Sequence, residues 1–195
     1  MHIFFAVISF VIIIAVTIPY MRDVIKGRAR PARAARVMLF LLLIITLLQQ
    51  HDLGSGYAMT VTFSELLSSA LLLGLALKYG VGGLALTDKI CYCLLAIDLM
   101  LWLLTKNTLL ALHLTILADT ISFWPTLEKT WRLPQSETKL FFWGGVIAPL
   151  FSIAAQNSFT YSVIVFPAYL SVINLVEIAV INSGKIRASH STNSI

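Results

Sequence analysis

Charged side chains are scarce in this chain. Only 12% of its 195 residues are Asp, Glu, Lys or Arg, while 58% are hydrophobic and the mean hydropathy is +0.89. Soluble domains carry about 25% charged residues, so this composition excludes an ordinary soluble domain. Backbone groups inside lipid must bond within their own segment, and long apolar runs therefore predict an all-α polytopic membrane protein.

Cysteine and histidine are also rare. The two cysteines, Cys91 and Cys93, are two positions apart on a predicted helix and point about 200° away from each other, which excludes a disulfide or a shared metal ion. The four histidines, His2, His51, His113 and His190, lie on different faces and at different depths of the predicted bundle, so three of them cannot easily converge. We therefore expect no metal ion and no cofactor.

Motifs of the common enzyme classes are missing from the sequence. It contains no G-x-S-x-G, Walker A or H-E-x-x-H pattern, and the last hydrophobic segment has no Lys to which retinal could attach. We therefore expect that the protein is not an enzyme.

Long apolar runs define the membrane topology. About 20 apolar residues are needed to cross the bilayer as a helix. We predict seven spans: Ile3 to Met21, Arg36 to Gln50, Tyr57 to Leu77, Ile90 to Thr105, Thr108 to Leu127, Leu140 to Gln156, and Tyr161 to Ile181.

Basic residues fall on one side of these spans. With the N-terminus outside and the C-terminus inside, 13 of the 14 Lys and Arg residues lie on the inner side, and Lys106 is the exception. Positive charge accumulates on the inner side of membrane proteins, so the pattern predicts this N-out/C-in topology. The net charge of +5 is then a topology signal, and we expect no nucleic-acid partner.

An internal duplication is visible at a spacing of 106 residues. Matching pairs at this one offset are Pro19 with Pro125, Lys26 with Arg132, Arg33 with Lys139, Thr46 with Ser152, and Gln50 with Gln156. The predicted divisions are a three-helix repeat at 1–79, a linker helix at 80–106, a second three-helix repeat at 107–183, and a polar cytoplasmic tail at 184–195. A single linker helix returns the chain to the face from which it started, so the two repeats have the same orientation in the membrane. The interface between such parallel repeats is the expected solute path.

This 3+1+3 plan resembles the PQ-loop superfamily, which includes the SWEET sugar carriers. The resemblance is strongest in the second repeat, where Phe123-Trp124-Pro125 leads through a basic stretch to Ser136-Glu137-Thr138. The Pro-Gln dipeptide that names the superfamily is absent, since Tyr20 and Thr126 follow the two prolines. The resemblance implies a seven-helix transporter, or a ligand receptor or trafficking protein of the same fold.

Acidic residues within the spans are the main candidates for function, because a charge in the bilayer is costly and usually serves a purpose. They are Glu65, Asp98, Asp119 and Glu177. We predict that Asp119 and Glu65 contact solute or protons and that Glu177 is solvated or paired near the inner boundary. For Asp98 two alternatives stay open, bracing of one repeat or contact with solute.

Polar residues on the same helices extend the candidate site. Ser68 shares a helical face with Glu65. Asn174 resembles, by position, the Asn that faces the sugar in SWEET carriers, although its repeat mate is not Asn. His113 does not share a face with Asp119, so the two are not a catalytic pair, and bonding of His113 between helices is the favoured interpretation.

Duplicated residues supply the candidate moving parts. Pro19 and Pro125 are interpreted either as hinges or as plain helix ends, because proline weakens the helix at its position. Gln50 and Gln156, at the outer ends of their helices, are candidate gate residues.

Taken as a set, these features predict a carrier of a small polar solute such as a sugar, vitamin or amino acid. It would be a uniporter or a proton-coupled carrier working by alternating access in the inner (plasma) membrane of a bacterium. The expected partners are the lipid bilayer, the solute and protons. Whether the chain forms a homo-oligomer is left open. The alternative is a membrane protein of the same fold that binds a ligand or assists assembly without transport.

Overall fold

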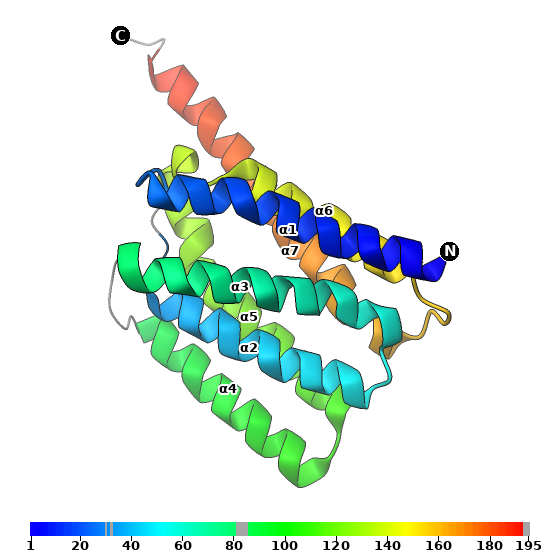
Figure 1. The fold of residues 1–195 in the computed structure, drawn as a ribbon. Coiled ribbons are helices and arrows are strands. Elements are labelled where there is room, and N and C mark those ends of the chain that lie inside the picture. The colour runs from blue at the N-terminus through cyan, green and yellow to red at the C-terminus, as the bar shows by residue number, and fades with distance from the viewer. Residues whose placement is uncertain (30, 32, 81–85, 193–195) are drawn as a thin grey trace.

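The computed structural model describes residues 1–29, 31, 33–80 and 86–192, and this part of the chain forms a bundle of helices (Figure 1). Its seven α-helices are α1 (His2–Ile25), α2 (Arg33–Asp52), α3 (Met59–Tyr79), α4 (Leu86–Thr105), α5 (Thr108–Arg132), α6 (Lys139–Ala154) and α7 (Tyr161–Thr192). Two short 3-10 helices, η1 (Gly56–Ala58) and η2 (Pro134–Ser136), lie in the connections before α3 and α6.

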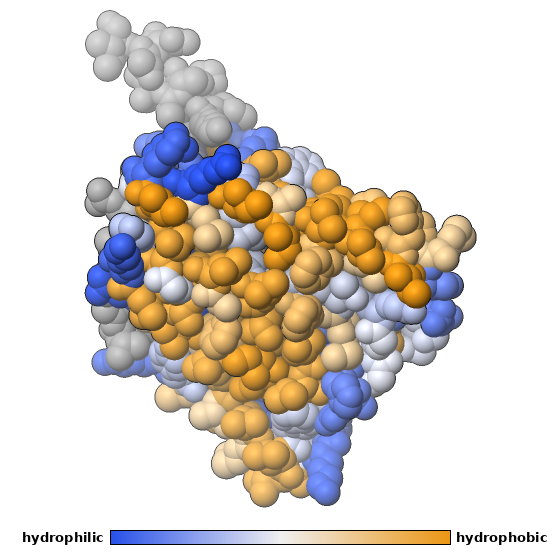
Figure 2. Space-filling model, in the orientation of Figure 1, coloured by the Kyte–Doolittle hydropathy of each residue, from blue (hydrophilic) through white to orange (hydrophobic). Residues whose placement is uncertain are grey.

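The length and surface of the helices identify an integral membrane protein. Within the described residues, α1, α2, α3 with η1, α5 and α7 are long and apolar enough to cross a bilayer, which makes five candidate spans. The apolar segment Tyr92–Thr105 of α4 and the 16-residue α6 are shorter. Figure 2 shows hydrophobic side chains across the middle of the displayed face, with hydrophilic ones gathered toward its margins. A surface of this kind can face lipid. A helix is stable there because its backbone N–H and C=O groups form hydrogen bonds with one another.

Packing follows one scheme in both halves of the bundle. α3 packs against α1 and α2, and α7 packs in the same way against α5 and α6. Between the halves, α1 packs on α6 and α2 packs on α5, while α4 lies against α5 and α2. α1, α3, α5 and α7 run in one direction, and α2, α4 and α6 run in the other (Figure 1).

The contact between α1 and α6 is especially close. A Cβ added to Gly144 of α6 would lie 2.4 Å from a methyl carbon of Val16 of α1, so only glycine fits there. Nearby, the Ser9 hydroxyl donates a hydrogen bond to the carbonyl oxygen of Ala148 at 2.8 Å. Small residues allow helix backbones to approach each other in this way.

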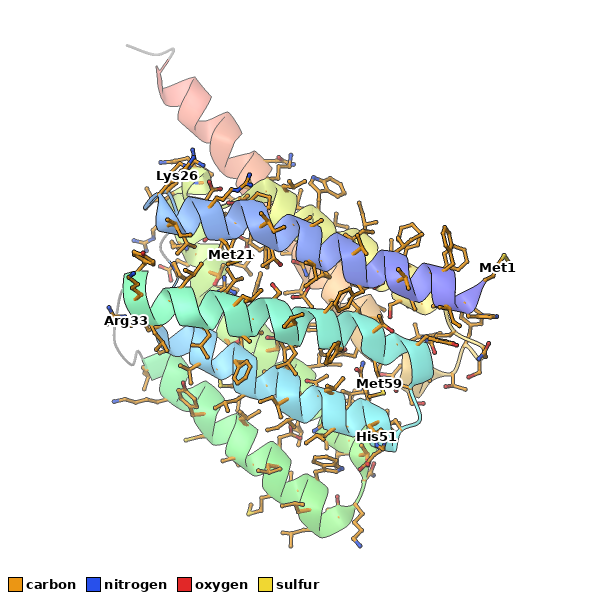
Figure 3. All side chains as sticks on the ribbon, viewed as in Figure 1. Met1, Met21, Lys26, Arg33, His51 and Met59 are labelled. Carbon is orange, nitrogen blue, oxygen red and sulfur yellow. The ribbon has the colours of Figure 1, made fainter. Side chains whose placement is uncertain are left out.

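The two ends of the bundle differ in charge. Lys26 and Arg33 lie at one end, which we call the basic end, and Met1, His51 and Met59 lie at the opposite end (Figure 3). The loop after α1 turns at Gly27, whose φ of +70° is readily adopted only by glycine.

Several helix boundaries differ from those predicted. α4 begins at Leu86 instead of Ile90, and α7 continues beyond Ile181 through most of the expected polar tail to Thr192. α1 extends past Pro19 to Ile25, and α5 passes through position 125 to Arg132. The interpretation of these two prolines as helix ends is therefore wrong, because proline removes one backbone bond without stopping either helix.

Candidate functional site

Asp119 is a buried acidic residue of the bundle whose carboxylate bonds to a tyrosine of a neighbouring helix. It lies on α5 with 6% of its surface exposed, and the Tyr169 hydroxyl of α7 donates to its Oδ2 atom at 2.8 Å. Thr120 donates to the Tyr169 oxygen at 3.2 Å. No Lys, Arg or His of the described residues lies within ion-pair distance of Asp119. A carboxylate with only neutral partners can still take up a proton or a cationic group.

Glu65 of α3 lies within electrostatic range of Asp119 and of Arg36. It is half-buried, and no hydrogen bond to it is found in the described part of the chain. Arg36 donates to the Tyr20 hydroxyl at 2.9 Å, with its guanidinium 5.3 Å from the centre of the Tyr20 ring. Arg36 is therefore half-buried on α2 and faces α1.

Ser68 and Asn174 hold their helices against neighbours in the same half of the bundle. The Ser68 hydroxyl lies 2.7 Å from that of Thr17 on α1. Asn174 donates to the Leu170 carbonyl at 2.8 Å, and its amide fills the space where a Cβ on Gly145 of α6 would sit. Among the described contacts, neither residue bonds to Asp119 or Glu65, so the structure does not join them to the two acids directly.

His113 is bonded between helices, as its favoured interpretation states. Its Nε2 atom lies 2.6 Å from the Tyr161 hydroxyl of α7, and the two rings stack with centroids 5.6 Å apart. The other ring nitrogen, Nδ1, lies 2.7 Å from the Leu109 carbonyl oxygen. His113 and Asp119 thus contact different tyrosines of α7 and form no pair.

The duplicated glutamines flank the same turn at the end opposite the basic loops. The Gln50 side chain is buried, and neither its amide nitrogen nor its amide oxygen has a hydrogen-bond partner. The backbone carbonyl oxygen of Gln50 accepts a hydrogen bond from the backbone N–H of Ser55 at 2.9 Å. The Gln156 side-chain oxygen lies 3.5 Å from where a Cβ on Gly56 would be. The Ser152 hydroxyl donates to the carbonyl oxygen of Tyr57 at 3.1 Å. The turn between α2 and α3 therefore rests on the end of α6.

Asp98 contacts both halves of the bundle, so of its two alternatives the bracing of a single repeat is wrong. Its Oδ2 atom accepts a hydrogen bond from the Gln49 amide of α2 at 3.1 Å, and another from the Thr115 hydroxyl of α5. All three side chains are fully buried. The packing of α4 against both α2 and α5 brings these residues together.

Glu177 of α7 does not reach water near the boundary. It is fully buried and accepts a hydrogen bond from the Thr130 hydroxyl of α5, while its second carboxylate oxygen has no partner. Of the two predicted alternatives, solvation is wrong, because α5 and the connection before α6 cover this part of α7.

The basic end carries polar contacts that the sequence analysis did not single out. The Thr138 hydroxyl, just before α6, donates to Asp23 of α1 at 2.6 Å, and Arg28 pairs with the same carboxylate. Lys129 and Glu137 form a further ion pair beside them. A pocket of about 270 Å³ opens between Asp23, Arg28 and Glu137. These contacts tie the end of α1 to the start of α6.

The neutral partners of the buried acids were also missed. They are hydroxyl and amide groups: Tyr169, Thr115 and Gln49 lie in apolar spans, where such residues are frequent, and Thr130 lies in the basic stretch after one. The signal that finds them is their pairing across helices, which depends on the packing.

Comparison with known protein families, with curated proteins and with solved structures finds no match to this chain.

Proposed function

We propose that this protein is a membrane carrier for a small polar solute and that it works by alternating access between two parallel repeats, α1–α3 and α5–α7, joined by α4. The observation that carries the proposal is that Glu65 of the first repeat and Asp119 of the second, two acids within the bundle, lie within electrostatic range of each other. Acidic residues inside a membrane bundle commonly mark solute or proton pathways. This arrangement resembles the plan of the PQ-loop carriers.

The packing scheme supports the two-repeat arrangement. Exchanging α1, α2 and α3 for α5, α6 and α7 turns each contact within one repeat into a contact within the other. The same exchange turns the contact of α1 with α6 into that of α5 with α2. Corresponding helices also run in the same direction (Figure 1), as expected for parallel repeats about an axis along the membrane normal.

The charge difference between the ends supports an orientation with the basic end in the cytoplasm. This orientation has the N-terminus outside and the C-terminus inside, in a bacterial plasma membrane, since cytoplasmic loops carry the excess of Lys and Arg. The seven helices would then all cross the bilayer. The short α6 is packed against α1 and α7, where the bilayer can thin to match it.

Contacts between the repeats at the two ends are candidates for the gates. At the outer end, Ser152 holds the turn before α3 against α6. At the basic end, Thr138 holds the end of α1 against the start of α6. Alternating access requires that one of these contacts open while the other stays closed, with Asp119 and Glu65 reached from one side at a time.

A binding protein without transport is the second candidate. α1 and α6 are joined along their length by hydrogen bonds at Ser9 and Asp23 and by close packing at Gly144. These contacts favour two repeats that do not move relative to each other. Counterflow of labelled sugars, amino acids and vitamins in proteoliposomes separates the two functions. A carrier accumulates label against trapped unlabelled solute, whereas a receptor binds solute in detergent without exchanging it.

A further inference from the structure

A polar junction is buried where α4 meets both halves of the bundle. Gln49 of α2, Asp98 of α4 and Thr115 of α5 have no exposed surface. The Thr115 hydroxyl lies 2.9 Å from the Gln49 side-chain oxygen and within hydrogen-bond distance of Asp98 Oδ2. The same three helices also pack an apolar cluster around Met38 and Leu95. A charge at this place has apolar surroundings on one side.

The junction has more acceptors than donors. Thr115 carries one hydroxyl proton, so it can donate to Gln49 or to Asp98 but not to both at once. The side-chain NH₂ group of Gln49 is the other donor, and it also donates to Asp98 Oδ2. Asp98 Oδ1 is buried and has no partner. No Lys, Arg or His of the described residues forms an ion pair with this carboxylate.

Positive charge is what this oxygen-rich site lacks. A buried carboxylate without a counter-charge is costly, and one that keeps an unbonded oxygen is more so. Protonation at Oδ2 would supply a donor for the Thr115 oxygen, but it would leave Oδ1 buried without a partner.

We infer that a small monovalent cation such as Na⁺ binds at this junction, with the Asp98 carboxylate, the Gln49 amide oxygen and the Thr115 hydroxyl as ligands. Hard cations prefer oxygen ligands of this kind, and a single carboxylate balances a single charge. Divalent ions usually take more carboxylates or keep a shell of water. This inference departs from the expectation that the chain holds no metal ion. The bound ion would fix α4 to both α2 and α5.

The test measures the melting temperature of the purified protein in detergent. NaCl is compared with choline chloride at equal ionic strength, because a ligand that binds only the folded state raises the melting temperature with concentration. We expect Na⁺ to raise it in the parent. Asp98→Asn should lose this shift, whereas Asp52→Asn, which removes an exposed acid from the end of α2, should keep it.

A second pair of variants decides the matter if Asp98→Asn does not fold. Thr115→Val removes a ligand and should raise the Na⁺ concentration for the half-maximal shift by about tenfold or more, whereas Thr115→Ser keeps the hydroxyl and the shift. An equal Na⁺ effect in the two Thr115 variants overturns the site, as does a parent that responds to Na⁺ no more than to choline. A parent stabilised in choline by low pH alone would mean that a proton supplies the charge. These outcomes do not depend on whether the protein transports a solute.

Discussion

Three buried carboxylates in this bundle have a hydroxyl as a partner. Tyr169 bonds Asp119, Thr115 bonds Asp98, and Thr130 bonds Glu177. A hydroxyl satisfies a hydrogen bond without cancelling the charge, so the electrostatic cost of burial remains for a proton, a cation or a solute to offset. Among these acids, Asp119 is the one within electrostatic range of an acid from the other repeat.

Replacing Asp119 tests whether it carries protons. Asp119→Asn keeps the shape of the side chain and its contact with Tyr169 but removes the titratable group. In proteoliposomes we expect the variant to lose the pH dependence of net transport while it still exchanges solute across the membrane. Asp52→Asn, at an exposed position, serves as the matched control.

The opposite result would assign Asp119 a structural role. If Asp119→Asn transports with the pH profile of the parent, the hydrogen bond to Tyr169 serves only to join α5 and α7. Glu65→Gln would then be the next variant to examine, since Glu65 is half-buried without a hydrogen bond in the described structure.

The importance of these acids could be predicted from the sequence, but their partners could not. A carboxylate in an apolar run such as Asp119 is conspicuous because membrane helices rarely carry one. Tyr169 lies 50 residues further along the chain, and nothing local distinguishes it from other tyrosines. The contact of Arg36 with Tyr20 could not be predicted for a related reason, since a cation near a helix end usually faces water or headgroups.

At the scale of helices, hydrophobic length predicted most elements to within a few residues. α2, α3 and α5 begin within three residues of their predicted positions. The ends of α5 and α7 extend further than predicted because hydrogen bonding continues past the apolar segment into polar residues. Hydropathy marks where a helix can lie in lipid and does not mark where its backbone bonds stop.

Close packing between α1 and α6 predicts a stability effect at Gly144. In Gly144→Ala, the new methyl group would meet Val16, and overpacking of this kind costs about 1–3 kcal/mol. We expect a lower melting temperature in detergent, and partial recovery in the Gly144→Ala, Val16→Ala double variant.

Gly74 provides the control for this prediction. A Cβ there meets nothing within 4 Å, so Gly74→Ala should leave the melting temperature unchanged or slightly raised. If Gly144→Ala is as stable as Gly74→Ala, α1 and α6 are not packed as closely as described.

Prolines within two repeat-related helices predict an effect on the rate of transport. Pro19→Ala and Pro125→Ala would restore a backbone donor and stiffen α1 and α5. We expect slower counterflow with unchanged solute affinity in both variants, and no such change in Pro167→Ala, which has no repeat mate. Unchanged counterflow in Pro19→Ala and Pro125→Ala would show that neither proline acts as a hinge.

At the scale of the whole molecule, the charge difference between the ends predicts which face is cytoplasmic. After replacement of Cys91 and Cys93 by alanine, Asp52→Cys should react with an impermeant maleimide added to intact cells, and Lys26→Cys should react only after the membrane is opened. Both positions are exposed at opposite ends of the bundle. The reverse pattern would contradict the proposed orientation.

The central claim is that Asp119 and Glu65, from two repeats, serve one transport path. The most direct measurement is counterflow of a labelled solute panel in proteoliposomes of the parent protein, with Asp119→Asn, Glu65→Gln and the exposed-site variant Glu128→Gln beside it. We expect at least one solute to accumulate transiently in proteoliposomes of the parent and of Glu128→Gln, and uptake to be altered in Asp119→Asn and Glu65→Gln. Solute binding in detergent without counterflow in the parent, or counterflow indifferent to both Asp119 and Glu65, would contradict it.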